Sequence, residues 1–323
     1  MKSINEKVMK IVFLVAACTS VLAVALICIF LFANGIPAMA KIGLPDFLFG
    51  MKWKPSNGLY GIFPFILGSI YVTAGAIVVG VPTALLLAIF LAFYCPKQLY
   101  SPLKAMVNLL AGIPSVVYGF FGLTVFVPLL RQLTGHDGST MLTASVLLGI
   151  MILPTVTGVA EPALKSVPTS YYEGALALGA THEKSVFGTV FPAAKSGVLA
   201  GVVLGIGRAI GETMAVIMVA GNQTWMPQGL FKGLRTMTAN IVIEMGYATD
   251  LHREALIATG VVLFVFILII KCKFYCNDSI IRIIFKRTLA LFILYLISNS
   301  FFFQSFEHHF PLLIVFLSLQ YKV

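Results

Sequence analysis

The sequence predicts an all-α protein that crosses a membrane several times, and three observations support this expectation. Of the 323 residues, 59% are hydrophobic and 11% are charged, whereas soluble domains carry about 25% charged residues. The mean hydropathy is +0.98. The apolar residues fall into long runs that glycines, prolines and charged residues separate, which is typical of helical membrane proteins. A water-soluble globular domain is therefore excluded.

Six apolar runs are candidate membrane spans, because a helix that rises about 1.5 Å per residue needs roughly 20 residues to cross the bilayer core. The first run, 11–33, could instead belong to a cleaved signal peptide, since Ala38-Met39-Ala40 resembles a cleavage site. Signal peptides have shorter apolar regions of about 7 to 15 residues, so we expect an uncleaved anchor. The other runs are 62–93, 106–130, 141–160, 197–220 and 255–270.

The charge distribution predicts the orientation of these spans. With six spans, both ends of the membrane core lie on one side, and that side receives 13 of the 22 lysines and arginines, whereas the opposite side receives seven. The positive-inside rule then places both ends in the cytoplasm. The net charge of +10 reflects these loop charges, and no basic stripe with interleaved aromatic residues indicates nucleic-acid binding.

The chain divides into four predicted regions. Residues 1–33 form the cytoplasmic N-terminal end and first span, 34–61 form a periplasmic loop, 62–271 form the membrane core with five spans, and 272–323 form an atypical tail. All 28 glycines precede this tail, which nevertheless holds nine of the 26 phenylalanines. We favour an altered terminus, such as a frameshifted end, over an extra membrane-associated segment.

Sequence signatures of enzymes are missing. The chain has no phosphate-binding G-x-x-x-x-G-K-[ST] loop, no H-E-x-x-H and no G-x-S-x-G. The five cysteines are scattered, and Cys272 and Cys276 have no second pair of ligands at zinc spacing. We therefore expect neither catalysis, metal nor cofactor, and any ATP-driven step must occur on another polypeptide.

Run 197–220 holds two ionisable residues near its middle, Arg208 and Glu212. Such residues are unfavourable in a bilayer and should face protein or water. Their i, i+4 spacing places both on one helix face, where they could form an internal ion pair or bind an anionic substrate. The same run should pack closely against other helices, because small residues recur four apart at Gly197, Gly201 and Gly205, and at Gly207 and Gly211.

The connection 161–196 is about 36 residues long and cytoplasmic in this topology. Ser166 or Thr169-Ser170 could cap a short helix that runs through Ala177, and Gly179 suits a left-handed stop. The pattern alone allows this helix to lie on lipid headgroups or to dock into a partner.

The residues of this connection resemble the EAA loop of ABC importer permeases, E-A-A-x3-G-x9-I-x-L-P. Glu173, Gly174, Ala175, Gly179 and Pro192 match its spacing, with Gly174 replacing alanine, Thr189 replacing isoleucine and Phe191 replacing leucine. The resemblance implies that the short helix is a coupling helix that sits in a groove of a separate ATPase subunit. It also implies the six-helix, MetI-like fold of type I ABC importer permeases in the bacterial inner membrane.

Stretches 111–119, 172–181 and 207–216 further resemble the PstC family of phosphate-importer permeases. This resemblance implies that Arg208 and Glu212 take part in phosphate movement. It implies a PstA-like second permease, a dimer of PstB-like ATPases and a PstS-like periplasmic binding protein that meets outer loops 34–58 and 221–253. A PhoU-like regulator and a sensor kinase are further expected partners. The alternatives are an importer for another oxyanion or solute and an ion-coupled secondary transporter.

Overall fold

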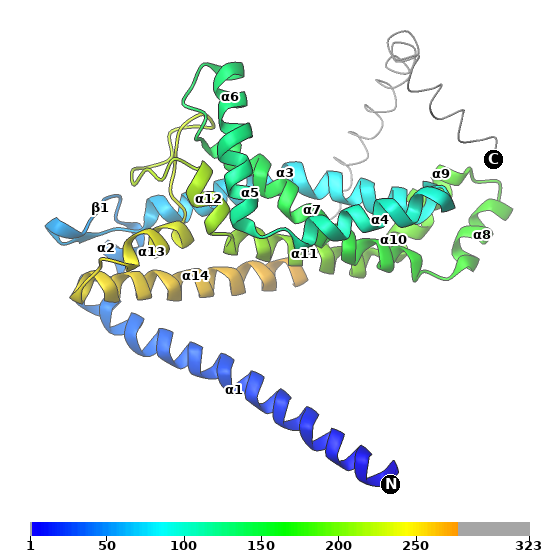
Figure 1. Cartoon of the computed structure of the whole chain (residues 1–323), viewed down its shortest axis with the longest axis horizontal. Helices are drawn as coiled ribbons and strands as arrows, with labels where there is room; N and C mark the ends of the chain where they lie inside the picture. Colours follow the sequence, from blue (N-terminus) through cyan, green and yellow to red (C-terminus); the bar gives the residue numbers. More distant parts are fainter. Residues whose placement is uncertain (1, 277–323) are drawn as a thin grey trace.

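The computed structural model describes residues 2–276 of the chain, with side chains from residue 8 to residue 273. Most of the predicted tail, residues 277–323, lies outside the described residues. The described part is a helical bundle with one two-stranded hairpin. Figure 1 shows α8 and α9 at one end of the bundle and β1, α2 and α13 at the opposite end.

Among residues 2–276, five helical segments are long and apolar enough to cross a membrane. They are Val8–Ile42, Phe63–Tyr94, Ser115–Thr134, Met141–Lys165 and Asp250–Lys273. A sixth crossing is formed if His182–Ala193 and Lys195–Gly211, which bend by 73° relative to each other, count as one broken span. The expectation of a polytopic all-α protein is therefore confirmed.

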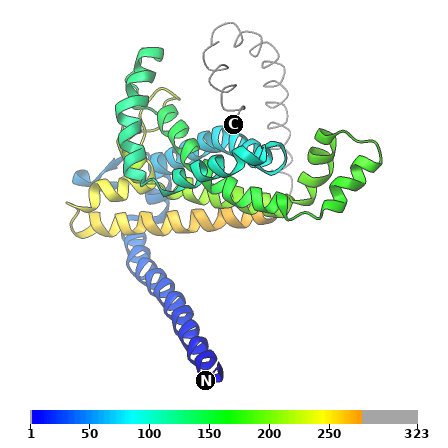
Figure 2. The same ribbon diagram turned by 45° about the vertical axis from the view of Figure 1, so that its right-hand side comes forward.

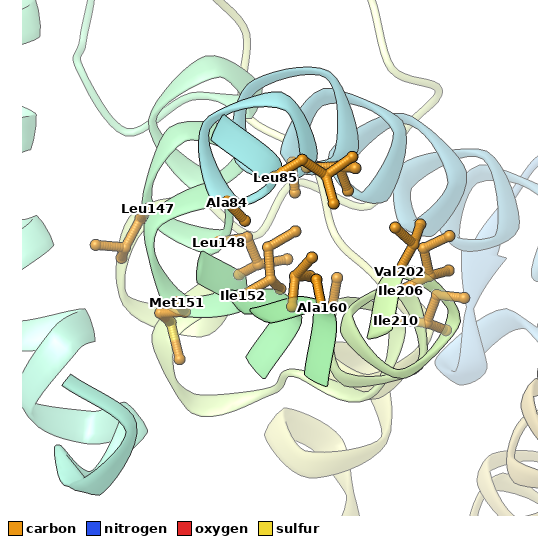
Figure 3. Close-up of a cluster of buried hydrophobic side chains, with 14 of the residues drawn as sticks. Ala84, Leu85, Leu147, Leu148, Met151, Ile152, Ala160, Val202, Ile206 and Ile210 are labelled. Carbon is orange, nitrogen blue, oxygen red and sulfur yellow. The ribbon is translucent and has the colours of Figure 1, made fainter. Parts of the chain in front are cut away.

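Helices α3 (Phe63–Ile89), α7 (Met141–Lys165) and α11 (Lys195–Gly211) form the centre of the bundle. Figure 3 shows Leu85 of α3, Ile152 of α7 and Ile206 of α11 pointing into one cluster of buried apolar side chains. Lipid tails are as apolar as leucine, so close packing rather than removal from water holds such helices together. Gly80 and Gly149 permit this packing, because a Cβ atom on Gly80 would lie 2.6 Å from the Gly149 carbonyl oxygen.

The long helix α1 (Lys2–Ile42) leaves the bundle at an angle (Figures 1 and 2). Only its last third packs against α14 (Asp250–Cys276), where Ala38 and Met39 are buried with Ala255 and Ala258. The helix therefore continues through the segment that resembles a cleavage site. Its apolar side chains from Val8 to Phe30 are exposed, as expected of a helix that faces lipid.

The predicted third span, 106–130, needs correction. Helix α4 (Lys97–Gly112) ends before Pro114, and the crossing begins only with α5 (Ser115–Phe121), which continues through the π-helical turn η3 (Gly122–Phe126) into α6 (Val127–Thr134). The extended backbone at Ile113 has a local cause, because proline disfavours helical conformation in the residue before it. Residues 106–112 therefore belong to a separate helix.

The end of the bundle opposite α8 and α9, the outer end, is built from short elements. Helix α2 (Leu44–Phe49) and the hairpin of β1 (Trp53–Lys54) and β2 (Leu59–Tyr60) follow α1, with the short 3₁₀ turn η1 (Pro55–Asn57) joining the strands. Trp53 pairs with Tyr60 across the antiparallel hairpin. Helices α12 (Met214–Val219) and α13 (Met237–Met245) complete this end.

At the other end, α3 continues into the π-helical turn η2 (Phe90–Tyr94). The long connection between α7 and α11 contains α8 (Thr169–Ala177), α9 (His182–Ser185), η4 (Val186–Val190) and α10 (Phe191–Ala193). Figure 2 shows the green helices of this connection projecting beyond the remaining helices. This arrangement presents α8 for contact with another molecule.

Candidate substrate pathway and coupling surface

The predicted span 197–220 is not one continuous helix. Helix α11 ends at Gly211, Glu212 has an extended backbone, and α12 begins at Met214. Arg208 lies in the last turn of α11, whereas Glu212 lies outside the helix. The prediction of one continuous helix is therefore wrong, whereas the shared face of Arg208 and Glu212 stays a prediction, because Glu212 is the C-cap residue of α11 and keeps a helical φ of −68°.

Arg208 is half-buried, and its Nε atom is buried without a hydrogen-bond partner. The ion pairs recorded among the described residues do not join Arg208 to Glu212. The Tyr118 hydroxyl of α5 is close enough to the Arg208 guanidinium to be affected by its charge. Lys271 of α14 lies beside Gly207, the residue before Arg208, because its Cε atom would lie 3.6 Å from a Cβ on Gly207. The guanidinium therefore keeps an unpartnered donor and has no ion pair with Glu212 among the described residues.

Glu212 uses its carboxylate and its backbone in different ways. Its Oε1 atom accepts a hydrogen bond of 3.2 Å from the Ala215 amide and so caps the start of α12. Its carbonyl oxygen accepts a hydrogen bond of 3.0 Å from the Thr238 hydroxyl of α13. The other carboxylate oxygen has no hydrogen bond recorded among the described residues. The helix break is therefore held by hydrogen bonds from α12 and from α13.

The five glycines of α11 lie in two different surroundings. Cβ atoms on Gly197 and Gly205 would lie 2.5 Å from Ala163 Cβ and 2.6 Å from Val156 Cγ2, both on α7, and Gly201 also lies against α7. Gly207 instead lies near Lys271, and Gly211 has open space around it. Close helix contact thus involves the first three glycines.

The EAA-like residues are placed on and around α8. Glu173, Gly174 and Ala175 lie within this helix, which buries none of its residues. Gly179 follows with φ +84°, the left-handed conformation that ends a helix. Pro192 is exposed in α10. The predicted end of the helix is thus observed, but the predicted serine or threonine cap is not, because Pro168 occupies the N-cap and no side chain bonds there.

Two large side chains of α8 and its C-terminal end are exposed. Leu178 is 91% exposed and Tyr171 is 52% exposed. A hollow of about 290 Å³ lies between the start of α8 and the start of α11, lined by residues that include Val167, Pro168 and Gly197. The projecting α8 and its C-cap residue thus expose two large side chains beside this hollow.

A buried charged cluster at the base of this connection was not predicted from the sequence. Glu161 of α7 is 1% exposed and accepts hydrogen bonds from the Tyr100 hydroxyl at 2.6 Å and from the Nζ atoms of Lys104 at 2.5 Å and Lys165 at 2.8 Å. The cluster fastens α4 to the end of α7. The i, i+4 spacing of Glu161 and Lys165 was a usable signal, whereas the contribution of α4 was not visible in the sequence.

A second buried cluster, also missed, ties the outer elements together. Glu244 of α13 accepts hydrogen bonds from Trp53 Nε1 at 2.7 Å and Arg235 Nη1 at 2.6 Å, and its Oε2 atom lies 2.9 Å from His252 Nε2. The sequence signal for this cluster is a single carboxylate, that of Glu244, within the largely apolar segment 239–245. Among the described residues, no group of three His, Cys, Asp or Glu side chains could hold a metal ion.

Comparison with known sequences gives one consistent result. A family model described as the inner membrane component of binding-protein-dependent transport systems matches residues 84–282. A probable ABC transporter permease of Bacillus subtilis is 38% identical, with the match covering 80% of this chain and 88% of that protein. Phosphate transport system permease proteins are 35% identical in Mesorhizobium japonicum, covering 74% and 79%, and 32% identical in Mycobacterium tuberculosis, covering 81% and 88%.

A solved structure has a similar fold. The inward-facing MetNI methionine ABC transporter matches with a TM-score of 0.53 and 20% identity, covering 72% of this chain and 99% of the matched chain. At this level of identity, the similarity concerns the fold alone. It agrees with the MetI-like arrangement that the sequence predicted.

Proposed function

The chain belongs to the family of binding-protein-dependent transport system inner membrane components, and on that premise we propose that it is the permease subunit of an ATP-driven phosphate importer. Family membership makes it a non-catalytic, multi-pass component of the inner membrane. It also means that an ATPase and a substrate-binding component act with it. The proposal concerns the substrate, the named partners and the residues that serve them.

The arrangement at Arg208 supports phosphate as the substrate. A buried polar atom without a partner is unfavourable by about 1–3 kcal/mol, and Nε of Arg208 is such an atom. A guanidinium can donate two parallel hydrogen bonds to a phosphate. A phosphate that passes Arg208 would satisfy this donor while it remains charged. Together with relatives that are phosphate transport system permeases, this is the observation on which the proposal depends.

Glu212 supplies a negative charge that would keep phosphate binding in this region weak. A site for transport must attract its substrate and also release it. The half-buried carboxylate at the helix break would lower the attraction of Arg208 for an anion. Alternating access of this region to the two sides of the membrane would then move phosphate inward.

The surface of α8 suits the coupling role. The helix buries none of its own residues and presents Leu178 beside Gly179, so an ATPase groove could take up its exposed apolar side chains. We infer a complex of this chain with a PstA-like permease, two PstB-like ATPases that bind ATP, and a PstS-like periplasmic binding protein. A PhoU-like regulator and a sensor kinase are further candidate partners.

The sequence allowed two alternative functions, an ion-coupled secondary transporter and an importer for another oxyanion or solute. Family membership argues against an ion-coupled secondary transporter, because components of this family work with a binding protein and an ATPase. An importer for another oxyanion differs only in substrate. Competition of phosphate uptake by excess sulfate or molybdate separates these two importers.

The test is uptake of radioactive phosphate at low concentration in cells that lack their own PstC-like subunit. The cells receive this chain, the chain ended after Lys273, Arg208→Ala or Arg208→Lys. We expect uptake with the ended chain and with the unmodified chain, and loss with Arg208→Ala while the complex remains in the membrane. Absence of uptake with both unmodified and ended chains, despite normal complex levels, would contradict phosphate transport. Disappearance of the complex with Arg208→Ala would give Arg208 a structural role instead.

A further inference from the structure

Thr238 of α13 contacts the helix break from a distant part of the sequence. Its hydroxyl donates a 3.0 Å hydrogen bond to the Glu212 carbonyl oxygen, 26 residues earlier in the chain. Thr238 is 7% exposed. The contact therefore replaces the helical hydrogen bond that this carbonyl would otherwise accept, because α11 has already ended.

The directions of the hydrogen bonds around Thr238 follow from the number of hydroxyl protons. Thr238 has one proton, which it donates to Glu212, so the Thr236 hydroxyl must be the donor in the 3.0 Å contact between Thr236 Oγ1 and Thr238 Oγ1. Thr236 Oγ1 in turn accepts from the Ala239 amide at 3.3 Å. One directed chain thus runs from the first turn of α13 to the Glu212 backbone. Successive hydrogen bonds of this kind polarise and strengthen one another.

The first turn of α13 is itself held firmly. The Met237 amide donates a 3.0 Å hydrogen bond to Ser69 Oγ of α3. Gly68 lets the Arg235 backbone lie directly on α3, because any Cβ there would overlap the Arg235 carbonyl oxygen. Arg235, which precedes α13, also donates to Glu244 Oε1 near the end of that helix. Thr238 is thus presented to Glu212 from an element anchored to the central helices.

We propose that Thr238 is a positioning residue for transport, which fixes the helix break and so sets where the Glu212 carboxylate stands in the pathway. The hydroxyl acts on the backbone of Glu212, and the carboxylate of the same residue caps α12. Movement of that backbone would displace the carboxylate, and small displacements of a functional group have large effects on rate. The inference rests on the proposed function of the pathway.

The test compares three variants of the full chain, assembled with its ATPase and second permease and supplied with the binding protein. Thr238→Val removes the hydroxyl and keeps the volume, and Thr238→Ser keeps the hydroxyl. Thr259→Val is the matched control, because Thr259 is also buried and its hydroxyl donates to a carbonyl oxygen, that of Ala255 within α14. The readouts are the maximal phosphate uptake rate per complex in the membrane, the half-saturating concentration, and ATP hydrolysis per phosphate transported.

We expect Thr238→Val to lower the maximal uptake rate per complex by about tenfold, with an unchanged half-saturating concentration and more ATP hydrolysed per phosphate. Thr238→Ser should stay within about twofold of the unmodified chain, as should Thr259→Val. Equal rates for Thr238→Val and Thr259→Val would overturn the inference, and so would equal losses for Thr238→Val and Thr238→Ser.

A second variant covers a failure of assembly. Thr238→Ala removes the hydroxyl and leaves space, so overpacking is not a concern. If neither Thr238→Val nor Thr238→Ala assembles, the hydroxyl serves the fold and the inference is wrong. Failure of the unmodified chain to transport phosphate would instead count against the proposed function, which keeps the two outcomes distinct.

Discussion

The Tyr100 hydroxyl donates a 2.6 Å hydrogen bond to the buried Glu161 carboxylate and thereby joins α4 to the end of α7. The connection between α7 and α11 leaves the bundle four residues later, after Lys165. Lys165 also bonds to Glu161, and its Nζ atom lies 3.8 Å from the Tyr100 ring centroid. Any force on the connection therefore reaches two helices at once. This relationship suggests how movement of an ATPase can be passed to the bundle.

We predict that Glu161→Gln destabilises the protein. The amide would leave Lys104 and Lys165 without their shared counter-charge, and removing one member of a buried pair is unfavourable by about 3–5 kcal/mol, less here because both lysines are partly exposed. Thermal unfolding of the detergent-solubilised complex should show a lower Tm. Glu173→Gln, on the exposed surface of α8, is the control, and equal Tm values for the two variants would contradict the prediction.

Local sequence rules predicted the end of α8 but not the break at Glu212. Gly179 ends α8 through its own backbone freedom, which its residue type reveals. Run 197–220 contains no proline, and its sequence predicts one apolar helix. The break at Glu212 involves the Ala215 amide and the Thr238 hydroxyl, and the second of these comes from a segment whose position only the fold determines. Nothing in the run itself indicated that partner.

The buried cluster around Glu244 yields a prediction about Trp53. Its indole donates to Glu244 Oε2 at 2.7 Å, and hydrogen bonds to charged groups contribute about 1.5–3 kcal/mol. Trp53→Phe keeps most of the ring contacts with Tyr60 and Phe65 but removes this donor, so chemical unfolding should show a loss of stability in that range. The matched control is Trp225→Phe, because Trp225 is 55% exposed. A similar loss in both variants would show that the indole donor is unimportant.

Two glycine-to-alanine changes should have opposite effects on stability. Gly197→Ala places a Cβ atom 2.5 Å from Ala163 Cβ, an atom that cannot rotate away, so α11 and α7 must move apart. We expect a loss of about 1–3 kcal/mol. Gly174→Ala lies in α8 with nothing within 4 Å and should stabilise that helix by about 0.5–1 kcal/mol. Thermal unfolding of both variants checks the pair, and a stabilising Gly197→Ala would contradict the packing described for α11.

Leu178 offers a test of the coupling surface that leaves the fold intact. The side chain is 91% exposed, so Leu178→Ser should not change the Tm of the permease. If an ATPase buries this leucine, its loss removes about 1.5–3 kcal/mol of apolar burial, which weakens binding by about tenfold or more. Titration of purified ATPase onto permease in lipid nanodiscs measures this change.

Leu133→Ser is the control for that titration, because Leu133 is 72% exposed in α6, away from α8 in Figure 1. Its substitution should leave ATPase binding unchanged. If Leu178→Ser and Leu133→Ser bind the ATPase equally well, α8 does not contact it through Leu178. The exposed apolar residues beside Gly179 would then be available to the lipid surface, which is the alternative that the sequence pattern of this helix allowed.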